Sequence, residues 1–165
     1  MSMRFRSVIP AVAAVVAFAA VPTAARAQQA PNLSGTWELD ASQSNFGMMP
    51  PPQKATVVIE HQEPTLKVTR TTVTARGERT TSETFTTDGK ESKNAGPMGN
   101  EYTSVLKWDG VVLTNTSKRQ MQGNEIDISE RWTVAPDGKT LTIARTVQSA
   151  MMPGPMEMKE VLVKK

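Results

Sequence analysis

Apolar and polar side chains alternate along most of the chain from Leu33 onward. A period of two residues is typical of a β-strand with one buried face, because successive side chains point to opposite sides of a sheet. No stretch of useful length carries the spacing of an amphipathic helix. The pattern predicts nine strands, which are Leu33–Leu39, Lys54–Gln62, Thr65–Thr74, Glu78–Thr87, Glu101–Trp108, Val111–Arg119, Glu125–Val134, Thr140–Gln148 and Glu157–Val163.

Residues that favour turns separate most of the predicted strands. They occur at Glu63-Pro64, Arg76-Gly77, Asp88-Gly89, Asp109-Gly110, Gly123-Asn124 and Pro136-Asp137-Gly138. Connections this short join antiparallel neighbours, so the sequence predicts an all-β, antiparallel up-and-down meander. We expect its eight to nine strands to close into a small barrel, because closure removes the unpaired edges of an open sheet. A β-sandwich is the alternative, and it would use the two long connections, Asp40–Gln53 and Asp88–Asn100.

The alternation also predicts which side chains face the interior. The outward positions are rich in Thr, Lys, Arg and Glu, as expected of a solvated outer wall. The predicted inward positions are Leu33, Gly35, Trp37, Leu39, Val57, Ile59, His61, Leu66, Val68, Phe85, Tyr102, Leu106, Trp108, Val111, Leu113, Ile126, Ile128, Trp132, Val134, Leu141, Ile143 and Val147.

Ionisable side chains interrupt this inward face at His61, Arg70, Glu130 and Arg145. Glu130 and Arg145 belong to consecutive predicted strands. If Val134 pairs with Lys139, Glu130 lies opposite Ile143 and one diagonal step from Arg145, within reach of a long side chain. A buried charge is costly unless it is paired, so we expect an ion pair. The pair either orients a polar group of a ligand in a cavity or has a structural role in the barrel.

The first 27 residues have the three parts of a secretory signal peptide. Arg4 and Arg6 precede the apolar run Val8–Val21, and Ala25-Arg26-Ala27 provides the small residues that signal peptidase requires. The apolar run is shorter than the about 20 residues of a transmembrane helix. The sequence therefore predicts cleavage after Ala27, a single domain over residues 28–165 with no transmembrane segment, and a periplasmic or secreted protein.

Composition excludes several kinds of chemistry. The chain has no cysteine and one histidine, so it cannot build a Cys/His zinc site, and no Gly-x-Ser-x-Gly or glycine-rich phosphate loop is present. Removing Arg4, Arg6 and Arg26 with the signal leaves 16 Lys and Arg against 16 Asp and Glu, which argues against a nucleic-acid partner. We therefore expect a protein without a cofactor that is not an enzyme. We expect His61, beside a Gln-Glu-Pro turn, to be exposed to solvent.

Methionines are frequent in the predicted connections. In a strict nine-stranded meander, one end of the barrel would carry Met98, Met121, Met151, Met152 and Met156, and Met48 and Met49 would lie at the other end. Thioethers bind Cu(I), and the candidate ligands are Met121, Met151, Met152 and Met156. The same side chains are also suited to lining an apolar binding site or to anchoring loops on the barrel.

A short motif at the start of the domain resembles a known family. The segment Leu33–Leu39, which reads LSGTWEL, resembles the Gly-x-Trp strand of lipocalins and other calycins and the start of exported bacterial lipocalin-like proteins. Later strands of those proteins are similar to the segments Glu130–Thr133 and Asp137–Thr142. The resemblance implies a barrel for small apolar ligands, with Trp37 at its closed end beneath a late-strand arginine matched by Arg145. The chain lacks the disulfide and a clear C-terminal helix of true lipocalins.

Together these observations predict an exported, non-enzymatic binding protein for a small hydrophobic ligand. The expected ligand-binding residues are Val57, Ile59, Val68, Arg70, Leu106, Leu113, Ile128, Glu130 and Arg145. Two alternatives stay open at this point. One is a periplasmic Cu(I)-binding protein that uses the methionines, and the other is a barrel filled with side chains that acts through its surface as an envelope interaction protein.

Overall fold

The computed structural model describes residues 29–96, 99–121 and 123–165, apart from the side chain of Met121. The predicted signal peptide, residues 1–27, lies outside this range, and so does Met98. Within the described residues, no helix has the length and apolar character needed to cross a membrane.

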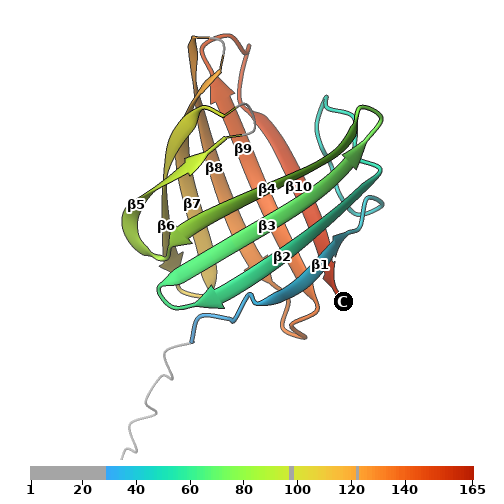
Figure 1. Ribbon diagram of the computed structural model, residues 1–165, viewed down its shortest axis with the longest axis vertical. Helices are drawn as coiled ribbons and strands as arrows, with labels where there is room; N and C mark the ends of the chain where they lie inside the picture. The colour runs from blue at the N-terminus through green and yellow to red at the C-terminus, as the bar shows by residue number, and fades with distance from the viewer. Residues whose placement is uncertain (1–28, 97–98, 122) are drawn as a thin grey trace, which may run out of the picture.

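The described part of the chain forms ten antiparallel strands in one sheet, in the order β4-β3-β2-β1-β10-β9-β8-β7-β6-β5 (Figure 1). Neighbouring strands in the sheet follow one another in sequence, except that β1 pairs with β10. The predicted antiparallel meander is confirmed. The strands are β1 Gly35–Leu39, β2 Lys54–Gln62, β3 Thr65–Thr74, β4 Gly77–Thr86, β5 Asp88–Ala95, β6 Glu101–Asp109, β7 Val112–Met121, β8 Asn124–Val134, β9 Thr140–Ser149 and β10 Met156–Lys164.

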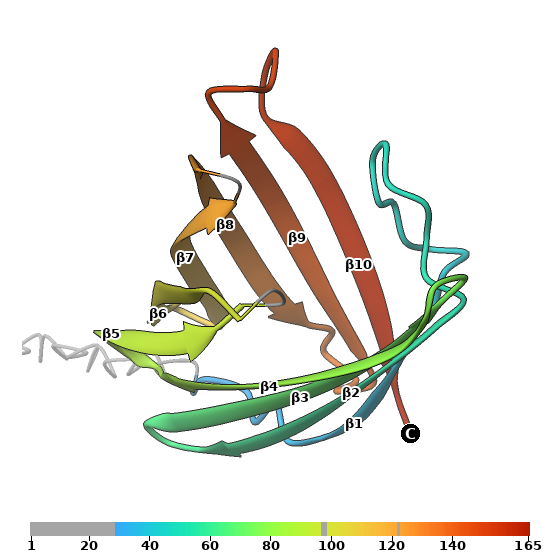
Figure 2. The same ribbon diagram turned by 45° about the horizontal axis from the view of Figure 1, so that its top comes forward.

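The sheet curves until its two outer strands, β4 and β5, approach each other and nearly close a barrel (Figure 2). Side chains of β5 bridge this seam by bonding to the backbone of β4. Thr84 N donates to Asn94 Oδ1 at 2.8 Å, Asn94 Nδ2 donates to Thr84 O at 2.9 Å, and Thr86 N donates to the Ser92 hydroxyl at 3.0 Å. An amide side chain thus satisfies strand-edge groups that a backbone ladder would otherwise satisfy.

Strand β5 occupies part of the segment Asp88–Asn100, which the sequence pattern predicted as a connection. Its inward side chains include Ser92 and Asn94, so the segment lacks the apolar alternation that marks the other strands. The additional strand changes which connections share an end of the barrel. Figure 1 shows the β1–β2 connection (cyan) and the β9–β10 connection (red) at the same end. The placement of Met48 and Met49 at the opposite end from Met152 was therefore wrong.

The pairing of β8 with β9 differs from the predicted register. Val134 pairs with Leu141 rather than Lys139, which puts Glu130 directly opposite Arg145. The cause is a wider turn, in which Ala135 N donates to Thr140 O at 2.8 Å and Gly138 N donates to Ala135 O at 2.9 Å. Gly138 has a φ of 69°, a conformation that glycine adopts without steric cost.

A hydrophobic core fills one end of the barrel, beside the β2–β3, β6–β7 and β8–β9 turns. Most predicted inward residues belong to it, and the indole of Trp37 is fully buried and donates to Leu33 O at 3.0 Å. The cation above Trp37 is Lys164, whose Nζ lies 5.2 Å from the ring centroid, whereas Arg145 bonds Glu130. The expected stacking of Arg145 on Trp37 was therefore wrong. The core comprises Leu33, Trp37, Val57, Ile59, Leu66, Val68, Phe85, Leu106, Leu113, Trp132, Leu141, Ile143 and Leu162.

Candidate ligand-binding cavity

A cavity of about 350 Å³ opens at the other end of the barrel, beside the β5–β6, β7–β8 and β9–β10 connections. This volume lies at the lower end of the roughly 300–1,000 Å³ range of small-molecule sites. The cavity is lined by Met49, Gly96, Asn100, Glu101, Tyr102, Arg119, Gln120, Ile126, Ile128, Arg145, Val147, Met152, Met156 and Met158.

Aliphatic and thioether side chains form much of the cavity wall. β8 and β9 contribute Ile126, Ile128 and Val147, and β10 contributes two methionines, of which Met158 is buried. Met49 and Met152 reach the cavity from connecting loops. Methionine is unbranched and polarisable, so these side chains can adapt to apolar molecules of different shape.

An ion pair lies where the cavity meets the core. Arg145 Nε donates to Glu130 Oε1 at 2.6 Å, and Glu130 Oε2 accepts from Asn115 Nδ2 at 2.9 Å and from Trp132 Nε1 at 3.0 Å. Burial alone would raise the pKa of Glu130, but the charge of Arg145 and these hydrogen bonds outweigh it and lower the pKa to about 2. Glu130 is therefore an ionised, fully engaged carboxylate at neutral pH.

A second ion pair crosses the interior from β3 to β10. Arg70 donates from both terminal nitrogens to the two carboxylate oxygens of Glu160, at 2.6 and 3.0 Å. The Glu160 side chain is 8% exposed and that of Arg70 is 26% exposed. Two parallel charge-assisted bonds fix the geometry of both side chains, so this pair joins two strands that are not neighbours in the sheet.

A third cluster of polar side chains surrounds Tyr102 on the cavity wall. Its hydroxyl donates to Glu83, and the guanidinium of Arg119 lies 3.9 Å above the centre of its ring. Arg119 is also 3.9 Å from Glu83, measured from its NH2 nitrogen to Oε1. Burial and the hydrogen bond to Glu83 raise the pKa of Tyr102 well above its ordinary value, so the phenol stays protonated.

The structure separates the nine residues predicted to bind ligand into three groups. Ile128 and Arg145 line the cavity, and Arg70 and Glu130 are held in ion pairs. The other five lie in the core at the closed end, and they are Val57, Ile59, Val68, Leu106 and Leu113. Ligand contact by any of the nine stays a prediction.

Several polar residues that lie in the interior were not predicted from the sequence. Glu83 lies two residues before the buried Phe85 on β4, and Glu160 lies two residues before the buried Leu162 on β10. The same alternation that identified Glu130 therefore contained a signal for both. Arg119 and Asn115 alternate with Leu113 on β7 and could have been found in the same way.

The methionines proposed as Cu(I) ligands are only partly brought together. Met152 and Met156 line the cavity, but Met151 is 70% exposed, and the side chain of Met121 lies outside the described part of the structure. Among the described residues, no group of three or more His, Cys, Asp or Glu side chains is placed to hold a metal ion. Cu(I) binding stays a prediction.

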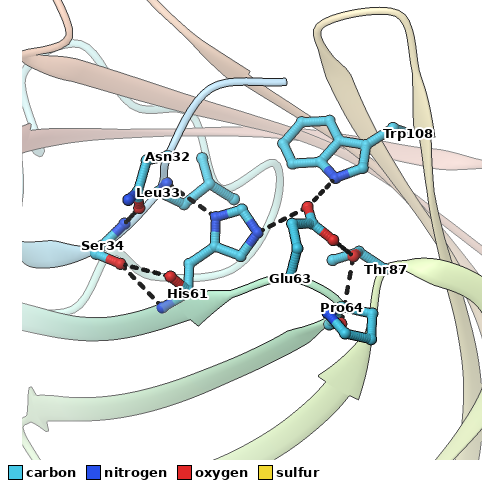
Figure 3. Close-up of polar contacts among 8 residues, drawn as sticks. All are labelled: Asn32, Leu33, Ser34, His61, Glu63, Pro64, Thr87 and Trp108. Atoms are coloured by element: carbon cyan, nitrogen blue, oxygen red, sulfur yellow. Dashed lines mark hydrogen bonds and ion pairs between the residues drawn. The ribbon is translucent and has the colours of Figure 1, made fainter. Parts of the chain in front are cut away.

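A separate polar cluster lies at the closed end of the barrel, around His61 (Figure 3). The His61 side chain is 4% exposed, so the expectation of a solvent-exposed histidine was wrong. Its Nδ1 accepts from Leu33 N at 3.2 Å, which leaves Nε2 to donate to Glu63 Oε1 at 2.9 Å. Glu63 also accepts from Trp108 Nε1 at 2.7 Å and from the Thr87 hydroxyl. These bonds connect the segment before β1 to the end of β2, and they connect the β2–β3 turn to the end of β6.

Neither a protein-family model nor a curated protein matches this sequence. Solved structures do match it in fold. The REP1-NXSQ fatty acid transporter is similar with a TM-score of 0.55 and 15% identity, covering 81% of this chain and 96% of that one. Zebrafish ileal bile acid-binding protein, complexed with cholic acid, has a TM-score of 0.55 and 17% identity, with coverages of 80% and 98%. Human cRBP IV has a TM-score of 0.52 and 16% identity, with coverages of 82% and 99%.

These structures are β-barrels of the calycin type, and the likeness extends over nearly the whole of each of them. At this level of identity the comparison shows the fold. The chain therefore has a lipocalin-like fold, with one end filled by its core and the other containing the cavity.

Proposed function

We propose that this protein is an exported, non-enzymatic carrier that binds a small hydrophobic molecule in the cavity at the open end of the barrel. The observation that carries the proposal is the cavity of about 350 Å³, which has Ile126, Ile128, Val147 and methionines in its wall. Burying apolar ligand surface against such a wall contributes about 25 cal/mol per Å² before the cost of association is subtracted.

The architecture supports binding rather than catalysis. The cavity floor, where the cavity meets the core, carries ionisable side chains that include Glu130 and Arg145. These two side chains are held by hydrogen bonds to each other and to neighbouring side chains. His61 lies at the opposite end of the barrel, where both ring nitrogens are engaged. Two proteins of the same fold are a fatty acid transporter and a bile acid-binding protein, and this favours binding of a small molecule with a large hydrophobic part by this chain.

Export is part of the proposal and rests on the sequence of residues 1–27. A carrier delivered to the periplasm or beyond would lose this segment and begin at Gln28. Expression of the full chain in a bacterium, followed by mass spectrometry of the periplasmic fraction, tests the cleavage. Recovery of an uncleaved chain from the cytoplasm alone would contradict export.

Binding in the cavity is tested by titration with the uncharged dye Nile red. Substitution of Val147 by Trp places a large side chain in the cavity, and we expect the dye affinity to fall by about tenfold or more. The matched control is Val58→Trp on the outer face of β2, where the residue is 38% exposed, and the affinity should not change. Equal affinity of both variants would contradict binding in this cavity.

One structural observation favours the alternative of Cu(I) binding. Met49, Met152, Met156 and Met158 line the same cavity. Thioether sulfurs bind Cu(I) without losing a proton. Titration of the protein with Cu(I) in competition with a chelator, before and after Met152→Leu, measures this activity. The leucine keeps the apolar surface, so Nile red binding should persist while any Cu(I) binding weakens.

A further inference from the structure

Positively and negatively charged side chains around the cavity floor form pairs, so their charges offset one another. In the described residues, three arginines enter this part of the interior and three glutamates face them, in the pairs Arg70–Glu160, Arg145–Glu130 and Arg119–Glu83. The first two pairs are hydrogen-bonded at 2.6 Å. The third is a contact of 3.9 Å, because Glu83 accepts from Tyr102 instead.

An anionic ligand would add a further negative charge to this balance. A carboxylate near Arg145 would also lie near Glu130, which is 8% exposed and already accepts from Arg145 Nε. The charge of Arg145 is therefore already offset, and repulsion from the buried Glu130 reduces what a ligand anion gains from it. The same reasoning applies to Arg70 and Glu160. Glu101, exposed at the cavity wall, adds further repulsion for an anion.

The polar atoms that are free to bond point to a different ligand group. Within the described residues, Arg119 Nε, Asn115 Oδ1 and the Ser117 hydroxyl are buried without a hydrogen-bond partner. All three belong to β7, but of the three residues only Arg119 lines the cavity. The donor offered to a ligand is therefore Arg119 Nε, whose charge Glu83 offsets, and it matches a single acceptor oxygen such as that of a hydroxyl, ester or carbonyl group.

We infer that the cavity selects an uncharged apolar molecule with a single oxygen function, such as a long-chain alcohol or ester, over the corresponding carboxylate. The inference rests on the proposed carrier function and specifies its ligand class. A water molecule occupies roughly 30 Å³ in the liquid, and a methylene group is of similar size. A cavity of about 350 Å³ therefore holds an alkyl chain of about a dozen carbons.

The test compares dodecanol, methyl dodecanoate and dodecanoate as competitors of Nile red, at about pH 8, where the acid is ionised. All three share one alkyl chain, so differences in affinity report the head group. We expect the alcohol and the ester to bind about tenfold more tightly than the carboxylate. Equal binding, or tighter binding of the carboxylate, would overturn the inference while leaving the carrier function intact. Failure of all three to bind would overturn the carrier function itself.

A variant that removes one negative charge provides a second test of the preference for alcohol over carboxylate. Glu83→Gln keeps an acceptor for the Tyr102 hydroxyl but leaves the charge of Arg119 without compensation. We expect the preference for alcohol over carboxylate to fall by about tenfold in this variant. The control is Glu91→Gln, an exposed position on β5 with the same change in net charge, where the preference should stay as in the parent. A fall of equal size in both variants would show a general charge effect and contradict the assignment to the cavity floor.

Discussion

Glu130 receives hydrogen bonds from its own strand and from both neighbouring strands. Asn115 of β7, Trp132 of β8 and Arg145 of β9 all donate to its carboxylate, at 2.9, 3.0 and 2.6 Å. Such an arrangement satisfies a buried anion at the level where the core ends and the cavity begins. The sequence predicted the Glu130–Arg145 pair because both side chains fall in phase with apolar neighbours. It did not predict the Asn115 donor, although Asn115 is also in phase with the apolar Leu113, because only ionisable residues on the inward face were considered.

Acid should weaken the fold through Glu130. Its pKa is about 2 in the folded protein against an ordinary value of 4.5, so its contribution to stability is present above pH 4.5 and is lost as the pH falls toward 2. The difference in pKa corresponds to about 3 kcal/mol. We therefore expect Glu130→Gln to lower the free energy of unfolding by about 3 kcal/mol at neutral pH, with the difference from the parent shrinking below pH 4.5. Urea unfolding over a pH series measures this, and a difference that does not depend on pH would contradict it.

Two tryptophans donate to glutamates in different surroundings, which allows a comparison of equivalent substitutions. Trp108 bonds Glu63, whose side chain is 51% exposed, whereas Trp132 bonds the buried Glu130. We expect Trp108→Phe to cost about 1 kcal/mol and Trp132→Phe about 2–3 kcal/mol, since a lost bond to a buried charge is not replaced by water. Urea unfolding of both variants gives the order, and the reverse order would contradict the described roles.

At the scale of elements, apolar alternation predicted nine of the ten strands with small differences at their ends. It missed β5 because the inward positions there include Ser92 and Asn94, which bond to the backbone of β4 instead of joining the core. The predicted register between β8 and β9 was also wrong, by two residues. A turn sequence such as Pro136-Asp137-Gly138 indicates where the chain reverses, but the hydrogen bonds of the flanking Ala135 decide how many residues the turn takes.

The seam between β4 and β5 gives a prediction about local stability. Asn94→Ala removes both bonds to the backbone of Thr84, each contributing about 1 kcal/mol at most because the site is accessible to water. We expect faster hydrogen exchange at the Thr84 amide and little change at amides in the centre of β3. Lys93→Ala, at the neighbouring exposed position, is the control and should leave the Thr84 amide protected. Unchanged exchange in Asn94→Ala would show that the seam closes without this side chain.

At the scale of the whole molecule, the barrel divides into a filled end, a charged layer and a cavity. The periodicity of the strands predicted the fold class and placed Ile128 and Arg145 in the interior, because it records which face of the sheet a residue occupies. It could not tell which interior residues line the cavity, since that depends on how far the core extends along the barrel. Met49 was placed at the wrong end of the barrel, because the end that a connection occupies depends on the number of strands, whereas Met152 lies at the cavity among the methionines suited to lining an apolar site.

The methionines allow the most direct measurement of whether the cavity binds an apolar molecule. Methyl resonances of labelled methionine are recorded during titration with dodecanol and assigned by single Met→Leu substitutions. We expect shifts for the residues that line the cavity, which are Met49, Met152, Met156 and Met158, and none for Met48 and Met151, which are 87% and 70% exposed. Shifts confined to Met48 and Met151, or no shifts at all, would contradict binding in the cavity.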